Sequence, residues 1–83
     1  MDEMRHVLEI LDEVLGLNGR TAAFTKDSPL LGAIPELDSM AVVSLITAVE
    51  DRFGIMVGDD EIDAATLGTV GSFVNFVERK LSA

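Results

Sequence analysis

The sequence predicts an all-α protein: a small four-helix bundle, with three longer helices, one short third helix, and a long loop between helices one and two. Apolar residues recur at three- and four-residue spacing in three separate segments, and no stretch shows a convincing strand pattern. Apolar residues make up 48% of the 83 residues, so residues 1–83 can bury a modest core as a single domain. A small bundle is the natural way to bury these helical faces together.

The first helix is predicted over residues 2 to about 16. Asp2 and Glu3 suit the positive end of its dipole, and Gly16, or Gly19 after Asn18, ends it. Its apolar face is formed by Met4, Val7, Leu8, Leu11, Val14 and Leu15.

Residues 17–38 lack a sustained period and form the long loop. Loops of this length in a small domain are usually functional or disordered. Apolar residues are spread through this one, so we expect it to pack back on the helices. Within it, residues 27–31 can form a short turn of helix, with Asp27 or Ser28 as the cap and Pro29 at the first position.

The second helix is predicted over residues 39–53, ending before Gly54. At about 100° per residue, Met40 and Val43 lie outside the core arc, beside the polar residues. Isolated exposed apolar residues are common, so the pattern alone leaves open whether these two form a contact surface. The core arc contains Val42, Leu45, Ile46, Val49 and Phe53, and the opposite face contains Ser44, Thr47 and Asp51.

An extended link over residues 55–57 leads to the short third helix, predicted over about 59–65. Its acids, Asp59, Asp60 and Glu61, lie at the N-terminal end, and Ile62 and Ala65 are expected to face inward.

The fourth helix is predicted over about 70–81, with Thr69 as its N-cap. Arg79 and Lys80 suit its C-terminal end. Its buried stripe is formed by Val70, Phe73, Val74, Val77 and Leu81.

The composition excludes several classes of function. A net charge of −9, from 15 acidic and 6 basic residues, argues against nucleic acid and favours basic protein partners. No apolar run approaches the roughly 20 residues that span a bilayer. Met1-Asp2-Glu3-Met4 lacks the basic start of a signal peptide, so we expect a soluble, cytoplasmic protein, and a monomer.

The sequence also lacks the residues that a catalytic or metal site needs. His6 is the only histidine, lies early in a solvent-facing part of the first helix, and has no oxyanion loop beside it, so we expect no enzyme. The chain has no cysteine to act as a nucleophile or a zinc ligand. Counting from Asp59 as an EF-hand loop places Ala64 where a glycine belongs and Val70 where a glutamate belongs. We therefore expect no metal site.

Ser39 is the candidate for chemistry, although Asp38-Ser39 before an apolar run is also an ordinary helix N-cap. A hydroxyl at a helix N-terminus is presented to solvent. A phosphate attached there would meet free backbone N–H groups and the positive end of the dipole. The position is therefore suited to a phosphodiester link.

Asp38-Ser39-Met40 resembles the Asp-Ser-Leu motif of acyl carrier proteins. The resemblance extends over nearly the whole chain. It includes the loop with Asp-Ser-Pro-Leu-Leu at 27–31, Glu-Asp-Arg-Phe-Gly-Ile at 50–55, the acids at 59–61, and Thr69-Val70 opening the last helix. The motif alone is weak, but its combination with residues 50–55 at the correct distance is strong.

This resemblance implies a function. In the family, the serine at the place of Ser39 receives 4′-phosphopantetheine from coenzyme A through a separate magnesium-dependent synthase, a phosphopantetheinyl transferase. The arm's thiol then carries acyl groups as thioesters, loaded by a ligase or transferase and used by downstream acyl-processing enzymes. The resemblance assigns Asp38 to positioning coenzyme A and metal during loading. It assigns partner contact to Met40, Val43 and Thr47.

Two departures from the family pattern concern the same surface. Glu36 stands where the family commonly has glycine, and Ala41 and Ser44 stand at places that are often acidic in fatty-acid carriers. The acids Glu36, Asp38, Glu50 and Asp51 remain as further contact candidates. The stretch 30–40 looks more like that of specialised free-standing bacterial carriers, including those of acyl-ligase and exosortase or exopolysaccharide systems.

Two alternatives remain open from the sequence. One is an aminoacyl or peptidyl carrier, although such carriers more often show Gly-Gly before the motif and less acidity. The other is a non-covalent helical binding module in which Asp38-Ser39 acts only as a cap. Loading with phosphopantetheine separates the carriers from the binding module.

Overall fold

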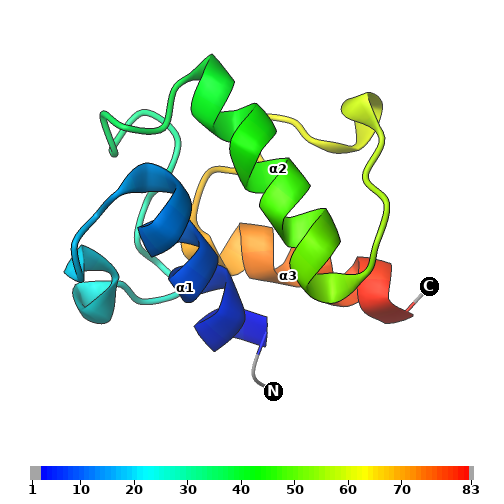
Figure 1. Ribbon diagram of the computed structural model, residues 1–83, viewed down its shortest axis with the longest axis horizontal. Coiled ribbons are helices and arrows are strands. Elements are labelled where there is room, and N and C mark those ends of the chain that lie inside the picture. Colours follow the sequence, from blue (N-terminus) through cyan, green and yellow to red (C-terminus); the bar gives the residue numbers. More distant parts are fainter. Residues whose placement is uncertain (1–2, 83) are drawn as a thin grey trace.

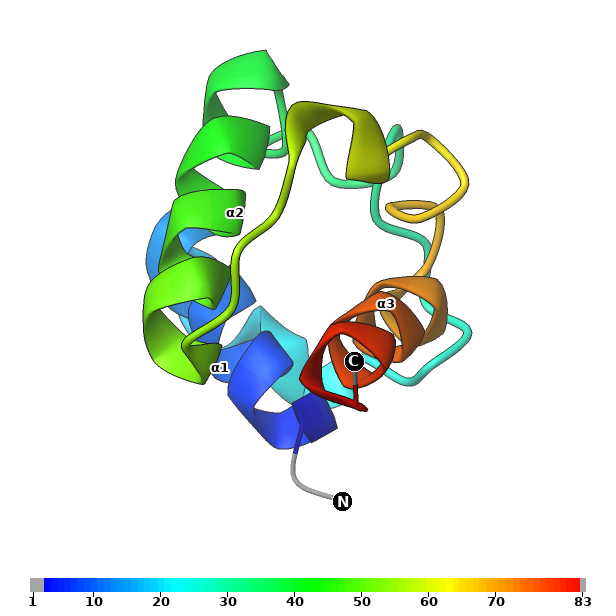
Figure 2. The same ribbon diagram turned by 90° about the vertical axis from the view of Figure 1, so that its right-hand side faces the viewer.

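The computed structural model describes residues 3–82, apart from the side chain of Asp59; Asp2, at the predicted start of the first helix, lies outside these residues. Three α-helices form the bundle: α1 (Glu3–Leu15), α2 (Ser39–Phe53) and α3 (Val70–Ser82). Two one-turn 3₁₀ helices, η1 (Arg20–Ala23) and η2 (Asp59–Glu61), lie in the connections. The helices surround one core, and long connections link α1 to α2 and α2 to α3 (Figures 1 and 2).

The predicted all-helical fold is confirmed, and so are the bounds of α2. The predicted third helix is shorter than 59–65, because only Asp59–Glu61 is helical. Ile62 packs against the core as expected, whereas Ala65 is exposed, so its predicted inward position is wrong. Glu61 holds this turn through hydrogen bonds from the Gly58 N–H and from Lys80 of α3, both 2.8 Å.

Glycines end α1 and α2, as the sequence predicts. Gly16 and Gly54 have φ values of +63° and +67°, a left-handed conformation that other residues adopt only with strain. The Leu17 N–H donates to the Asp12 carbonyl at 3.1 Å, and the Ile55 N–H donates to the Glu50 carbonyl at 3.2 Å. These bonds satisfy carbonyl groups that a helix end otherwise leaves unpaired.

The core face of α2 is rotated slightly from the predicted arc. Leu45 and Val49 are buried, and two small residues, Ala41 and Ala48, pack against the core at one edge of the face. Ile46 lies at the other edge, where it is only partly buried and does not pack against the core. Its predicted place in the core is therefore wrong.

The buried stripe of α3 also differs from the prediction at two residues. Val70, Phe73, Val74 and Val77 are buried as predicted. Phe76, absent from the predicted stripe, is buried as well, and Leu81 is 41% exposed because it lies in the last turn, past the core.

The α1–α2 loop is held by backbone pairing with the segment that precedes α3. The Leu30 and Leu31 N–H groups donate to the Gly68 and Leu67 carbonyls at 2.9 and 3.0 Å, and Pro29 forms an isolated bridge with Thr69. The predicted turn of helix at 27–31 is therefore wrong. The chain is extended there because the backbone groups bond across the molecule instead of along a local helix.

The same loop closes the N-terminus of α3. The Ser28 carbonyl accepts from the Val70 N–H at 2.9 Å, and the Lys26 carbonyl accepts from the Gly71 N–H at 2.7 Å. The hydroxyl of Thr69 accepts from the Ser72 N–H at 3.1 Å, which confirms Thr69 as the predicted cap. Three backbone donors that a helix start leaves unpaired are thus satisfied within the protein.

A substitution at Gly71 tests the importance of the contact between the Lys26 carbonyl and the start of α3. A Cβ at this position would lie 2.8 Å from the Lys26 carbonyl oxygen, closer than nonbonded atoms approach. Replacing a helical glycine with alanine ordinarily gains up to about 1 kcal/mol. We expect Gly71→Ala to lose roughly 1–3 kcal/mol instead, measured by urea denaturation, because the loop must move away. Asn75→Ala, an exposed change in the same helix, is the control and should be nearly neutral; a more stable Gly71→Ala protein would contradict the prediction.

Candidate functional site

The candidate site is the start of α2, where Asp38 is the N-cap. Asp38 has an extended backbone, and its Oδ1 accepts a hydrogen bond from the Ala41 N–H at 2.8 Å. Ser39 is the first residue of the helix itself. The capping role that the sequence allowed for either residue therefore belongs to Asp38, and Ser39 is not needed for it.

The hydroxyl of Ser39 lies in solvent at the positive end of a 15-residue helix. Among the described residues, no partner engages its hydroxyl or the backbone N–H groups of Ser39 and Met40. The start of α3 differs, because the loop closes it. A phosphate linked to Ser39 therefore fits: the hydroxyl is free, and two N–H groups are open to its oxygens.

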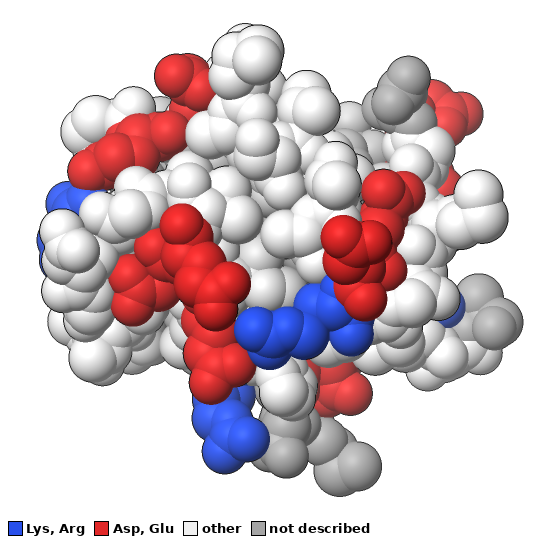
Figure 3. Space-filling view, in the orientation of Figure 1, with Lys and Arg blue, Asp and Glu red and all other residues white. Residues whose placement is uncertain are grey.

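An uncharged patch follows Ser39 along α2. We define the α2 patch as Met40, Val43, Ser44 and Thr47, all exposed, with Met40 and Val43 at 77% and 62%. The Thr47 hydroxyl donates to the Val43 carbonyl at 3.1 Å, so it is satisfied within the helix. Figure 3 shows the surface over the N-terminal half of α2 without charged side chains, between groups of acids. The predicted exposure of Met40 and Val43 is confirmed.

Two of the acids predicted to contact partners have structural partners within the protein. Glu36 pairs with Arg20 of η1. A hydrogen bond from its own backbone amide, and then the Arg20 guanidinium, hold the pKa of Glu36 below its ordinary value. The Glu50 carboxylate accepts from the Val57 N–H at 2.8 Å and so anchors the link after α2. Asp51 is exposed near the end of the helix.

The structure separates Ser39 from the only histidine. His6 lies against the far end of α2, where its ring meets Phe53 edge-on at 6.0 Å and its Nδ1 lies 3.0 Å from the Arg52 guanidinium. The 15 residues of α2 span roughly 20 Å at 1.5 Å per residue, so a Ser-His pair cannot form. Among residues 3–82, no cluster of three potential ligands could hold a metal ion.

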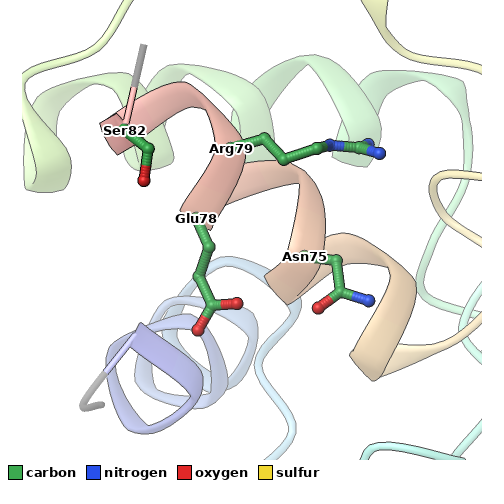
Figure 4. Close-up of a pocket in the computed structure, with 4 residues that line it drawn as sticks. All are labelled: Asn75, Glu78, Arg79 and Ser82. Atoms are coloured by element: carbon green, nitrogen blue, oxygen red, sulfur yellow. The ribbon is translucent and has the colours of Figure 1, made fainter.

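A hollow of about 520 Å³ lies beside α3, among the four side chains drawn in Figure 4. Asn75, Glu78, Arg79 and Ser82 line it, all from one helix, so no second element encloses a ligand there. It contains none of the predicted site residues. The start of α2 is therefore the better candidate.

Arg20 is the residue near the site that sequence reasoning missed. It lies 16 positions before Glu36, and no local pattern signals that the two side chains meet. The unengaged N–H groups of Ser39 and Met40 were foreseeable, since any helix start has them. The sequence did not show whether the fold would leave these N–H groups open, as it does at α2, or cover them, as it does at α3.

Comparison with known proteins identifies the family. Residues 5–77 match the family model described as "Phosphopantetheine attachment site". Acyl carrier proteins of Acidothermus cellulolyticus and Thermotoga maritima are each 32% identical, over 83% and 90% of this chain and 76% and 86% of their own lengths. The solution structure of a holo acyl carrier protein from Nitrosomonas europaea is 53% identical over the full length of both chains, with a TM-score of 0.92.

These matches cover the start of α2 and all three helices. Within residues 3–82, no helix has the length and apolar character that a membrane crossing needs. Members of this family act as carriers and not as enzymes, in agreement with the sequence-based expectation. The chain belongs to the acyl carrier proteins, the family that bears covalently attached 4′-phosphopantetheine.

Proposed function

We propose that Ser39 is the attachment residue and that the protein carries acyl groups on a 4′-phosphopantetheine arm bound to its hydroxyl. The observation that carries the proposal is the exposed Ser39 at an open helix N-terminus, with its capping function already supplied by Asp38. When attached, the group supplies a thiol that holds acyl groups as thioesters, which this cysteine-free chain otherwise lacks. The chain's own contribution is to present and orient that arm.

We further propose that the α2 patch is where partner enzymes dock. Met40 lies next to Ser39, and the patch combines large exposed apolar side chains with uncharged polar ones. Exposed apolar groups bordered by charge are typical of protein interaction sites. The partners would be a phosphopantetheinyl transferase, an acyl-loading ligase or transferase, and downstream acyl-processing enzymes. The uncharged Ala41 and Ser44 favour a specialised pathway over housekeeping fatty-acid synthesis.

The acids at the edges of the α2 patch would help to attract partner enzymes electrostatically. With a net charge of −9, the protein attracts basic surfaces at long range. Asp51 is free to contact a partner, whereas Glu36 and Glu50 would do so only in addition to their internal bonds. We place the working protein in the cytoplasm, where coenzyme A is available for loading. We expect a monomer in which residues 1–83 act as one carrier domain.

Intact mass tests the attachment residue. Incubated with coenzyme A, magnesium and a broad-specificity phosphopantetheinyl transferase, the protein should gain one phosphopantetheine, about 340 Da. Ser39→Ala should remain folded, because Asp38 still caps the helix, and should gain no mass. Ser82→Ala, which removes an exposed serine of α3 outside the site, is the control and should load normally. Failure of the folded wild-type protein to gain mass with several transferases would refute the assignment.

Asp38 is proposed to support loading through its charge. Asparagine caps helices about as well as aspartate, so Asp38→Asn should change the free energy of unfolding by less than about 0.5 kcal/mol. The loading rate should nevertheless fall at least about tenfold, equivalent to 1.4 kcal/mol, because the charge that positions metal and coenzyme A is lost. Asp60→Asn, at an exposed acid outside the site, should load at the wild-type rate. Equal loading by both variants would show that Asp38 is only a cap.

Paired substitutions in α2 test the docking patch. Val43→Glu and Met40→Glu should each change stability by less than about 0.5 kcal/mol, since both side chains are exposed. Each should weaken productive docking by about 1–2 kcal/mol, seen as a lower kcat/KM of the transferase. Val49→Glu should instead unfold the domain in a thermal melt, because Val49 is 1% exposed and an unpaired charge there is costly. Unchanged kinetics for both patch variants would place docking elsewhere.

A further inference from the structure

The methionines of the described chain differ in their access to solvent. Met40 and Met56 are 77% and 84% exposed, whereas Met4 is partly buried and packs against the core. The sequence has no cysteine, so methionine supplies all of the sulfur that the chain itself carries. The thioethers of Met40 and Met56 are therefore open to an oxidant in solution, while that of Met4 is partly covered.

A hydroperoxide oxidises an exposed thioether without help from a catalytic group. The sulfur lone pair attacks a peroxide oxygen, the O–O bond breaks and an S–O bond forms. The departing hydroxide takes the proton of the transferred oxygen, so hydrogen peroxide yields one sulfoxide and one water. Sulfur is oxidised by two electrons, and the peroxide is reduced by two. The product is polar and chiral, and methionine sulfoxide reductases convert it back to the thioether.

The two exposed methionines are alike in exposure but differ in position. Met40 follows Ser39 directly, and together with Val43 it supplies the large apolar side chains of the α2 patch. Met56 lies in the link after α2, which leaves the helix at the end opposite Ser39 (Figure 1). The 15 residues of α2, roughly 20 Å of helix, separate the two positions. Met56 is therefore a matched internal control for Met40.

Oxidation changes what Met40 offers to a partner enzyme. A thioether is a flexible and polarisable apolar group that adapts to an apolar surface. A sulfoxide oxygen accepts hydrogen bonds, and covering it without a donor costs free energy. The fold does not depend on this side chain, because Met40 is exposed and Asp38 supplies the cap of α2. The cost of oxidation therefore falls on docking and not on folding.

We propose that Met40 is a peroxide-sensitive modification site, and that its oxidation to the sulfoxide weakens the docking of partner enzymes beside Ser39. This inference rests on the proposed attachment at Ser39 and on docking at the α2 patch. The Asp-Ser-Leu motif that residues 38–40 resemble has leucine at this place, which holds no sulfur, so the sensitivity is a property of this chain's own sequence. Because the sulfoxide is reducible, docking recovers when the oxygen is removed.

The test oxidises the apo protein with a limited dose of hydrogen peroxide, before the thiol of an arm is present. Each sulfoxide adds about 16 Da to the mass. Trypsin places Met40 and Met56 in separate peptides, 27–52 and 53–79, so the oxygen can be assigned to either residue. Both should be oxidised before Met4. The kcat/KM of the phosphopantetheinyl transferase should then fall at least about fivefold. The two methionine sulfoxide reductases, one for each epimer, should restore it.

Three variants assign the effect to Met40. Oxidised Met40→Leu should load with the kcat/KM of its own unoxidised form, whereas oxidised Met56→Leu should lose as much as the wild-type protein does. Met40→Gln, which places a polar group at the same position, should lower kcat/KM without any oxidant. Circular dichroism should show the same helical content before and after oxidation, because the modified side chains are exposed.

Three outcomes overturn the proposal. The first is an equal loss in oxidised Met40→Leu and oxidised wild-type protein, and the second is an oxidised, folded wild-type protein that loads at its unoxidised rate. The third is oxidation of Met40 that is no faster than that of Met4. Failure of the underlying proposals gives different results. Unoxidised protein that gains no mass refutes the attachment, and unchanged kinetics for both Met40→Glu and Val43→Glu refute docking at the patch; the Met40 proposal falls with either.

Discussion

The pairing between residues 26–31 and the segment 67–71 is the constraint on which the rest of the structure depends. It joins parts of the chain about 40 positions apart through backbone hydrogen bonds of 2.7–3.0 Å. It supplies carbonyl partners to the start of α3, and it turns a loop too long to be rigid by itself into a fixed frame. That frame leads the chain to Asp38, where α2 begins.

This arrangement makes the two helix starts chemically unequal. The loop closes α3, whereas α2 receives only the Asp38 carboxylate on the Ala41 N–H. The positive end of α2 is therefore left for an outside anion, and Ser39 stands at that end. Much of the protein's acidity is engaged elsewhere, as Glu36 and Glu50 show. The α2 patch that follows Ser39 is left uncharged, although the protein as a whole is strongly acidic.

A large part of this structure follows from short-range pattern. Helix faces repeat every three to four residues, so the apolar spacing predicted α2 with its bounds and the exposure of Met40 and Val43. The end of α2 followed from Gly54, because a left-handed residue is needed there. The position of Ser39 at a helix start could also be predicted from the sequence, since it depends only on where the helical repeat of apolar residues begins. The resemblance of residues 38–40 and 50–55 to a known family then supplied the chemistry.

Only the tertiary structure decided the features that depend on distant partners. Pro29 lies in extended chain and not in a helical turn, because its neighbours bond to the segment before α3. Arg20 meets Glu36 only through the folding of the loop. The sequence alone determined the three long helices and where Ser39 stands, because those properties are encoded within a few turns. The fold decided that the start of α2 would stay open while the start of α3 is closed, because closure needs carbonyl groups from a separate segment.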